Sequence, residues 1–164
     1  MNLLSLARDN ISDLLIRIIE FTHTRQQVLA ENIRNIDTVG FTPKDLAVGE
    51  FGRALNEAIV EHVQNQRLVL RDTDNIKFGA NTSLQATPLV DEYANEMLGQ
   101  NKDVFLELQI SKLGENLLNR KIAAELLMQK QQTFAFFNQC AADKLTIRQS
   151  DPKFTPMFRD KTQY

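Results

Sequence analysis

Apolar side chains recur at three- and four-residue steps near both ends of this chain, and this periodicity most limits its fold. The first run covers residues 11–36, where Arg25 is the one polar interruption, and the second covers residues 103–145. Such steps place side chains on one face of an α-helix. The second run is apolar on two sides, so its helix needs more than one partner. The sequence predicts a mainly α-helical chain with long N- and C-terminal helices.

The expected organisation has four parts. Residues 1–43 form the N-terminal helix and a turn, because Gly40 tolerates the positive φ of a helix-ending residue and Pro43 prevents continuation. Residues 44–102 form a variable, partly irregular middle segment. Residues 103–145 form the C-terminal helix, and residues 146–164 form an extended tail that contains two prolines.

The middle segment has weaker signals. Residues 51–63 have helical spacing, and residues 90–98 suggest a short helical piece. Residues 68–70 suggest a short strand. Residues 72–88 are rich in Asn, Thr, Asp and Gly, which predicts a loop.

Composition excludes several classes of protein. The 19 basic and 21 acidic side chains leave no positive surplus for nucleic acid, where phosphate neutralisation dominates binding. The apolar stretch at residues 14–19 contains Arg17 and is too short to span a membrane. It also lacks the order of charged, apolar and small residues that a signal peptide needs. We therefore expect a soluble chain without a cleaved export signal.

No pattern of catalytic or metal-binding residues stands out. Glu20 and His23 form an E-x-x-H pair, but His62, the second of the two histidines, has no Glu three residues before it. Cys140, the single cysteine, has no base nearby in sequence to activate it, so we expect it to pack as a small apolar residue. We predict no catalytic residue, no metal and no cofactor, hence no enzymatic activity.

Three phenylalanines lie close together in the second helical run, at Phe134, Phe136 and Phe137. They fall on successive helix faces and cannot all be buried in one hairpin. We interpret them as a partner-binding anchor, with core packing as the alternative.

A polar motif followed by a turn closes the first helical run: Asn32-Ile33-Arg34-Asn35, then Thr38-Val39-Gly40-Phe41. Residues 25–41 resemble the N-terminal signature of flagellar rod, hook and hook-associated proteins, N-I-A-N followed by T-P-G-Y or T-P-G-F. Here Arg34 replaces Ala and Val39 replaces Pro, but Gly40 keeps the φ > 0 position of a type II turn. The run from Arg25 to Ala30, with Lys44-Asp45 and Glu50-Phe51, is similar to the B-type proximal rod proteins.

The second helical run is also similar to the closing helix of that family. The similarity lies in residues 104–107, Ile110, Leu113, Asn116, residues 123–127 and Lys130, while residues 117–121 offer a competing register. The resemblance implies an antiparallel coiled-coil-like hairpin of the two long helices. It implies an assembly motif of Arg25, Asn32, Ile33, Asn35, Thr38, Gly40 and Phe41. It also implies a helix interface of Ile18, Leu29, Leu106, Ile110, Leu113, Asn116, Leu117 and Leu127.

The resemblance further implies a structural protein of the flagellar basal body, exported by the flagellar type III apparatus without a cleaved signal peptide. Its expected place is the rod in the periplasm. Its expected partners are copies of itself, other rod subunits, and the membrane-ring and export-gate adaptor proteins at the rod base. Two alternatives remain: a helical chaperone or adaptor of a secretion system, and a small helical enzyme.

The asparagines of the motif have two interpretations. Side-chain amides near a helix end can satisfy exposed carbonyls or reach a neighbouring subunit. In the alternative, Asn32 and Asn35 are ordinary polar surface residues.

Overall fold

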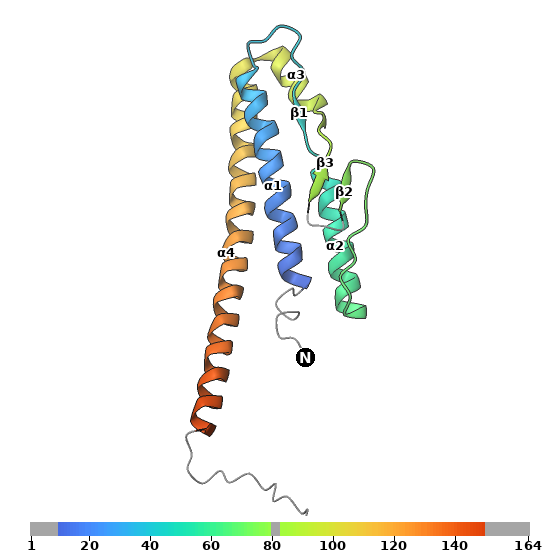
Figure 1. Ribbon diagram of the computed structural model, residues 1–164. Helices are drawn as coiled ribbons and strands as arrows, with labels where there is room; N and C mark the ends of the chain where they lie inside the picture. Colours follow the sequence, from blue (N-terminus) through green and yellow to red (C-terminus); the bar gives the residue numbers. More distant parts are fainter. Residues whose placement is uncertain (1–9, 80–82, 150–164) are drawn as a thin grey trace, which may run out of the picture. The chain divides into compact units, whose positions relative to one another are not determined.

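A computed structural model describes residues 10–79 and 83–149 of the chain (Figure 1). Among these residues, those up to Leu127 form one compact unit, and those from Met128 to Gln149 belong to a second. The described part contains four helices and four short strands: α1 Asn10–Arg34, β1 Lys44–Asp45, α2 Val48–Asn65, β2 Ile76–Phe78, β3 Leu84–Ala86, β4 Leu89–Val90, α3 Glu92–Gln100 and α4 Lys102–Gln149. The prediction of a mainly helical chain is confirmed.

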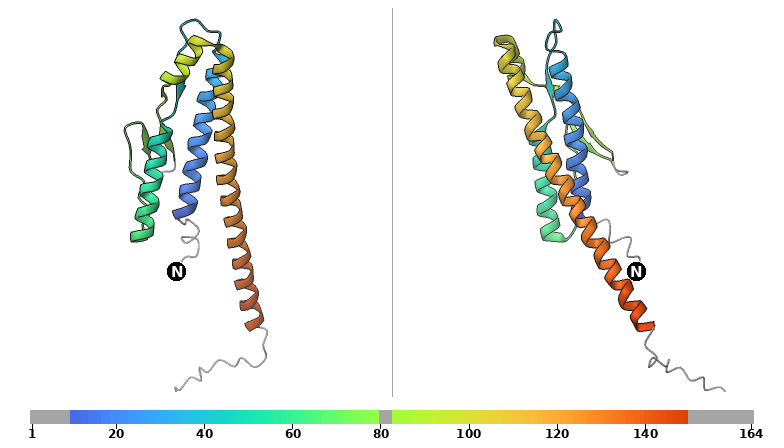
Figure 2. Two further views of the ribbon diagram at one scale, coloured as in Figure 1. Left: turned by 180° about the vertical axis from the view of Figure 1, so that it is seen from behind. Right: turned by 90° about the vertical axis from the view of Figure 1, so that its left-hand side faces the viewer.

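The long helices α1 and α4 pack against each other and run in opposite directions (Figures 1 and 2). Hydrogen bonds join Asn32 of α1 to Gln109 of α4, and Arg120 of α4 to Gln26 of α1. The prediction that the two long helices pack together is confirmed. The buried residues of α4 recur at intervals of four and seven positions, which places them on one face: Phe105, Gln109, Asn116 and Ala123.

The ends of the long helices lie close to the predicted ones. Residues 11–36 and 103–145 were expected, and the helices span Asn10–Arg34 and Lys102–Gln149. Residues 146–149, predicted as tail, are therefore helical. The rest of the predicted tail, residues 150–164, lies outside the described residues.

The two shorter helices correspond to the helical pieces predicted in the middle segment. α2 spans Val48–Asn65, and Gln66 after it adopts a left-handed backbone with φ 55°. α3 follows Asp91, whose carboxylate accepts a hydrogen bond from the backbone N–H of Ala94 at 3.0 Å. This bond caps the N-terminus of α3.

Two predictions for the middle segment are wrong. Residues 68–70 form no strand, and residues 72–88, predicted as a loop, contain β2 and β3. The reason is a partner distant in sequence: Glu50 of α2 accepts hydrogen bonds from Thr73 at 2.8 Å and from Asn75 at 2.7 Å. This carboxylate fixes the chain just before β2, so turn-forming residues lead into a strand.

The hydrophobic core joins α1 to the middle segment. β2 and β3 form an antiparallel pair, and β1 pairs antiparallel with β4. Phe21 of α1 and Phe51 of α2 stack with their ring centroids 4.0 Å apart. The core cluster contains Phe21, Val28, Leu46, Phe51 and Ile76. The middle segment therefore covers one side of α1, while α4 covers another.

Candidate assembly surface

Asn32 holds the end of α1 in place and is only 2% exposed. Its Oδ1 accepts a hydrogen bond from the backbone N–H of Lys44 at 3.0 Å, and its Nδ2 donates to the Lys44 carbonyl at 2.7 Å. The same Nδ2 also donates to Oε1 of Gln109 at 3.0 Å. One side chain thus connects α1, β1 and α4. The interpretation of Asn32 as an ordinary surface residue is wrong.

The neighbouring motif residues have lesser contacts. Asn35 is half-buried, and its Nδ2 donates to the carbonyl of Glu31 at 3.0 Å, one turn earlier in the chain. Ile33 is half-buried on α1. The two asparagines therefore satisfy backbone carbonyls, but only Asn32 reaches another element.

Four charged side chains meet beside Asn32. Arg25 donates to both carboxylate oxygens of Asp45, from Nε at 2.8 Å and from Nη2 at 2.9 Å. Lys112 of α4 donates to the same carboxylate at 3.1 Å and also to Asp91. Two cations and two anions leave this ion cluster, Arg25, Asp45, Lys112 and Asp91, without net charge. It connects α1, β1, α4 and the cap of α3.

The ion cluster shifts the ionisation of its members. Burial raises the pKa of Asp45, but the hydrogen bonds and positive charges of Arg25 and Lys112 outweigh burial and hold this pKa below its ordinary value. Burial lowers the pKa of Arg25, and the hydrogen bond and charge of Asp45 raise it above its ordinary value. Both shifts favour the charged forms, which keeps the pair ionised.

The turn after α1 has the predicted conformation. Gly40 has a φ of 76°, and the N–H of Phe41 donates to the carbonyl of Thr38 at 3.1 Å, as in a type II turn. Val39, which replaces the proline of the motif, is 99% exposed. Thr38 is exposed and Phe41 is half-buried. The turn therefore presents one apolar side chain to solvent.

The structure divides the residues predicted to form a helix interface. Leu29 and Asn116 are buried; Ile18, Leu106, Leu113 and Leu127 are half-buried; Ile110 and Leu117 are exposed. The inner face of α4 includes Asn116, which was predicted for the interface, and Gln109, which was not. Asn116 donates to the backbone carbonyl of Thr22 at 2.7 Å. Polar as well as apolar side chains of α4 therefore contact α1.

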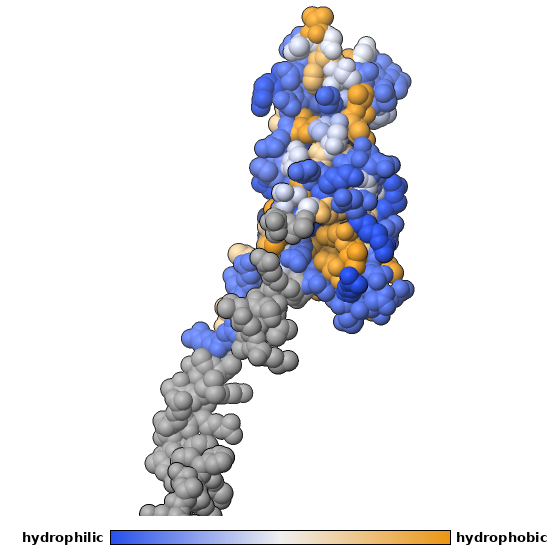
Figure 3. Space-filling model, turned by 45° about the vertical axis from the view of Figure 1, so that its right-hand side comes forward, coloured by the Kyte–Doolittle hydropathy of each residue, from blue (hydrophilic) through white to orange (hydrophobic). Residues whose placement is uncertain are grey.

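Two sides of α4 carry exposed apolar residues. Leu118, Ile122 and Leu126 follow one another at four-residue steps and are 58%, 47% and 48% exposed. Ile110 and Leu117 are 62% and 54% exposed. Figure 3 shows one face of the molecule, on which apolar patches lie between polar side chains. Neighbours at four-residue steps share a helix face. The chain therefore leaves an apolar row on α4 uncovered by its own described elements.

The tempting catalytic and metal-binding candidates have ordinary contacts. Glu20 accepts a hydrogen bond from Arg17 at 3.0 Å. His62 lies 3.1 Å from the side-chain nitrogen of Asn10, and His23 is exposed on α1. Within residues 10–79 and 83–149, no three His, Cys, Asp or Glu side chains gather as a metal site would require.

The aromatic cluster of the second helical run belongs to the unit that begins at Met128. Phe136 is exposed and Phe134 is half-buried. The side chains of Phe137 and Cys140 lie outside the described part of the structure. The interpretation of the cluster as a partner-binding anchor stays a prediction.

The sequence analysis did not identify the residues that contact Arg25 and Asn32. It did not single out Asp91, Lys112 or Gln109, and it named Asp45 only as part of the similarity to rod proteins. A signal did exist for one of them: Arg25 interrupts an apolar stripe, and a charge on a buried face needs an opposite charge nearby. The spacing of the residues does not identify which acidic side chain pairs with Arg25.

Comparison of this chain with protein-family descriptions, curated proteins and solved structures finds no match. Among the described helices, none combines the length and the apolar character that crossing a membrane requires.

Proposed function

We propose that this chain is a non-enzymatic, structural subunit of the proximal rod in the bacterial flagellar basal body. It assembles with copies of itself and with other rod subunits into a helical shaft that flagellar motility requires. In the shaft, α1 and α4 form a coiled-coil-like hairpin. The resemblance of residues 25–41 to the rod, hook and hook-associated signature supports this proposal.

The observation that carries the proposal is the uncovered apolar row on α4. Leu118, Ile122 and Leu126 are each about half exposed although α1 packs on the same helix. Exposed apolar rows of this kind are typical of surfaces that associate with another protein. A structural subunit has such a surface because its neighbours cover it after assembly.

A shaft requires contacts that continue from subunit to subunit. A head-to-tail contact between different surfaces generates an open helical filament when the rotation does not close a ring. The chain has different surfaces for such a contact: the turn with Val39 lies at one end of α1, and the apolar row lies along α4. This asymmetry suits a filament better than a closed dimer.

Location and partners follow from the same proposal. The subunit leaves the cytoplasm through the flagellar type III export apparatus without losing a signal peptide, and it joins the rod in the periplasm. Its partners are other rod subunits and the membrane-ring and export-gate adaptor proteins at the rod base.

The test uses a strain that lacks this gene and carries variant copies. Without the chain, we expect membrane rings without a rod, and hence no motility. Leu118→Asp with Ile122→Asp places charges on the apolar row of α4, so we expect a folded but non-motile variant. Glu107→Lys, an exposed change on the same helix, is the matched control and should restore motility.

Electron microscopy of isolated basal bodies and circular dichroism of the purified variants are the two measurements. Rods of normal length in the deletion strain, or normal motility in the double variant, contradict the proposal. A chain that binds one exported subunit and never assembles with itself is instead a chaperone or adaptor.

A further inference from the structure

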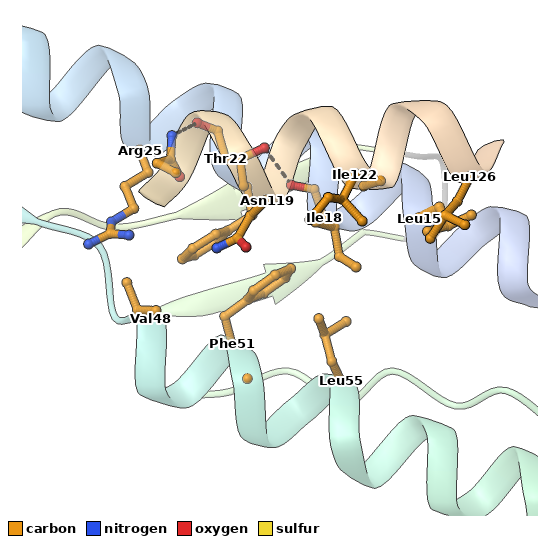
Figure 4. Close-up of a pocket in the computed structure, with 14 residues that line it drawn as sticks. Leu15, Ile18, Thr22, Arg25, Val48, Phe51, Leu55, Asn119, Ile122 and Leu126 are labelled. Atoms are coloured by element: carbon orange, nitrogen blue, oxygen red, sulfur yellow. Dashed lines mark hydrogen bonds between the residues drawn. The ribbon is translucent and has the colours of Figure 1, made fainter. Parts of the chain in front are cut away.

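One exposed apolar side of α4 is not part of the row on which the proposed function rests. In that row, Ile122 and Leu126 also line a cavity between α1, α2 and α4 (Figure 4). Ile110 and Leu117 lie on another side of α4, are more than half exposed, and do not line this cavity. This second side therefore needs a partner of its own.

The second side has the spacing of a coiled-coil contact. Positions on one helix that follow one another at steps of seven, or of four and three, share a face and meet a second helix along its length. Five exposed residues of α4 follow one another at steps of seven, four, three and four: Asp103, Ile110, Gly114, Leu117 and Lys121. We call these five residues the α4 seam.

The middle of the α4 seam has room for a large side chain from another helix. A Cβ atom at Gly114 would meet no side chain or neighbouring element of the described residues within 4 Å. Glycine inside a helix is less favourable than alanine, and its use is the close approach of another group. Ile110 is exposed one turn away, so it can pack on Gly114 of a second copy.

The charges of the α4 seam determine the direction of the second helix. Asp103 lies at its N-terminal end and Lys121 at its C-terminal end. A parallel copy would set like charges beside each other, which disfavours association. An antiparallel copy sets Lys121 of each chain against Asp103 of the other. The same alignment sets Ile110 over Gly114, because both pairs of positions are centred on position 112.

We propose that two copies of this chain pair antiparallel through the α4 seam, with Ile110 of each copy over Gly114 of the other and Lys121 against Asp103. The contact is self-complementary, so both copies use the same surface about a twofold axis. Such a pair has no direction and does not repeat along a shaft, so it belongs to the free chain before assembly. The inference goes beyond the proposed function, whose apolar row stays outside the pair.

Analytical ultracentrifugation of the full chain in reducing buffer tests the inference. Leu118→Asp with Ile122→Asp breaks the apolar row, so the association that remains belongs to the α4 seam. We expect this variant to form dimers with a Kd in the micromolar range, as small interfaces do. Adding Ile110→Asp should raise the Kd at least about tenfold, because a charge then enters an apolar contact. The wild-type chain is measured as a second background, in which the row is unchanged.

Gly114→Gln probes the centre of the contact without harming the fold. The added side chain starts in open space in its own chain, but it takes the place of Ile110 of the second copy. We expect a free energy of unfolding that is unchanged or higher, and a Kd at least about tenfold higher. Ser111→Gln, an exposed change outside the α4 seam, is the matched control and should keep the Kd within about twofold.

A charge swap tests the antiparallel direction. Lys121→Glu should raise the Kd about tenfold, because both ion pairs become pairs of like charge. Adding Asp103→Lys to the same chain forms the two ion pairs in reverse, so the Kd should return to within about threefold of its original value. A parallel pair would show no such rescue, because each charge would face its own copy.

Three results would overturn the inference. They are monomers at all concentrations in both backgrounds, dimers of Ile110→Asp or Gly114→Gln as strong as those of the unchanged chain, and no rescue by the charge swap. Circular dichroism verifies that each variant is folded. Motility and rod formation decide the proposed function separately, since a motile row variant contradicts that function and leaves the dimer in place.

Discussion

Arg25 of α1 and Asp45 of β1 form a two-point ion pair, with donor–acceptor distances of 2.8 and 2.9 Å. The Arg25 side chain is 6% exposed and the Asp45 side chain 14% exposed. Because the pair is withdrawn from water, removal of one partner leaves the other charge poorly solvated. This pair therefore differs from the exposed ion pair of Lys102 and Asp37.

We expect Asp45→Ala to lower the free energy of unfolding by about 3 kcal/mol, because Arg25 then stays buried without its partner. Urea denaturation followed by circular dichroism measures this change. Asp37→Ala, which removes a partner from the exposed pair, should cost less than about 1 kcal/mol. Similar losses in the two variants would show that burial does not strengthen the Arg25 pair.

The free energy of unfolding should also depend on pH, because Asp45 titrates in the acid range. Its pKa in the folded chain lies below the ordinary value of 3.8, so its stabilising effect is fully present above that value. The effect is lost as the pH falls through the folded pKa. We expect the urea midpoint of the native chain to fall in this acid range, and Asp45→Asn to be less sensitive there. Parallel pH curves for the two proteins would contradict this.

Asn32 and Asn35 should differ although both belong to the motif. Asn32→Ala removes hydrogen bonds to Lys44 and Gln109 and leaves buried polar groups unpaired, so we expect a loss of about 3 kcal/mol. Asn35→Ala removes one bond to the last turn of α1 and should cost about 1 kcal/mol or less. Thermal or urea unfolding of the purified variants measures both losses. Equal losses of stability in the two variants would contradict the prediction.

Gly40→Val should destabilise the turn through the backbone alone. A Cβ atom at this position meets nothing within 4 Å, but the φ of 76° disfavours a β-branched residue. We expect a cost of about 1–2 kcal/mol. Gly40→Asn should cost less, because Asn tolerates this region better. A cost for Asn as large as that for Val would point to a contact of the turn rather than to its conformation.

Gln109 offers a test of a buried polar group without a partner. Its Nε2 makes no hydrogen bond within the described residues, while its Oε1 accepts from Asn32. Gln109→Met removes the unpaired donor, and Asn32 still bonds to Lys44, so we expect a change of about 1 kcal/mol or less. Gln109→Glu places a charge there and should cost about 3 kcal/mol or more. The two unfolding curves should therefore separate widely.

The spacing of apolar residues was sufficient to predict the two long helices, because this spacing is a local property of the sequence. Residues 11–36 and 103–145 are long enough for apolar spacing to identify a helix, and α1 and α4 lie within a few residues of these ranges. The strands β2 and β3 are three residues each, too short for a reliable alternation. Their place depends on Glu50, whose partners lie 23 and 25 residues away.

The face of α4 that contacts α1 could be predicted only in part, because it too depends on residues distant in the sequence. The spacing identified apolar rows on the second helix, but it did not tell which row faces α1. Gln109 and Asn116 occupy that inner face because α1 presents Asn32 and the Thr22 carbonyl to them. Complementary polar groups on a distant element leave no periodic trace in the sequence, so the pattern did not single out Gln109, and this chain's described residues leave Ile110 and Leu117 exposed.

The amide of Asn32 has a consequence for the two-residue strand β1. One edge of β1 pairs with β4, and on the other side the N–H and C=O of Lys44 are taken by the Asn32 amide, as they would be by a neighbouring strand. A strand of another molecule therefore finds no open edge at Lys44 on which to add itself. Although α4 exposes apolar side chains, the backbone at Lys44 is closed to amyloid-like growth.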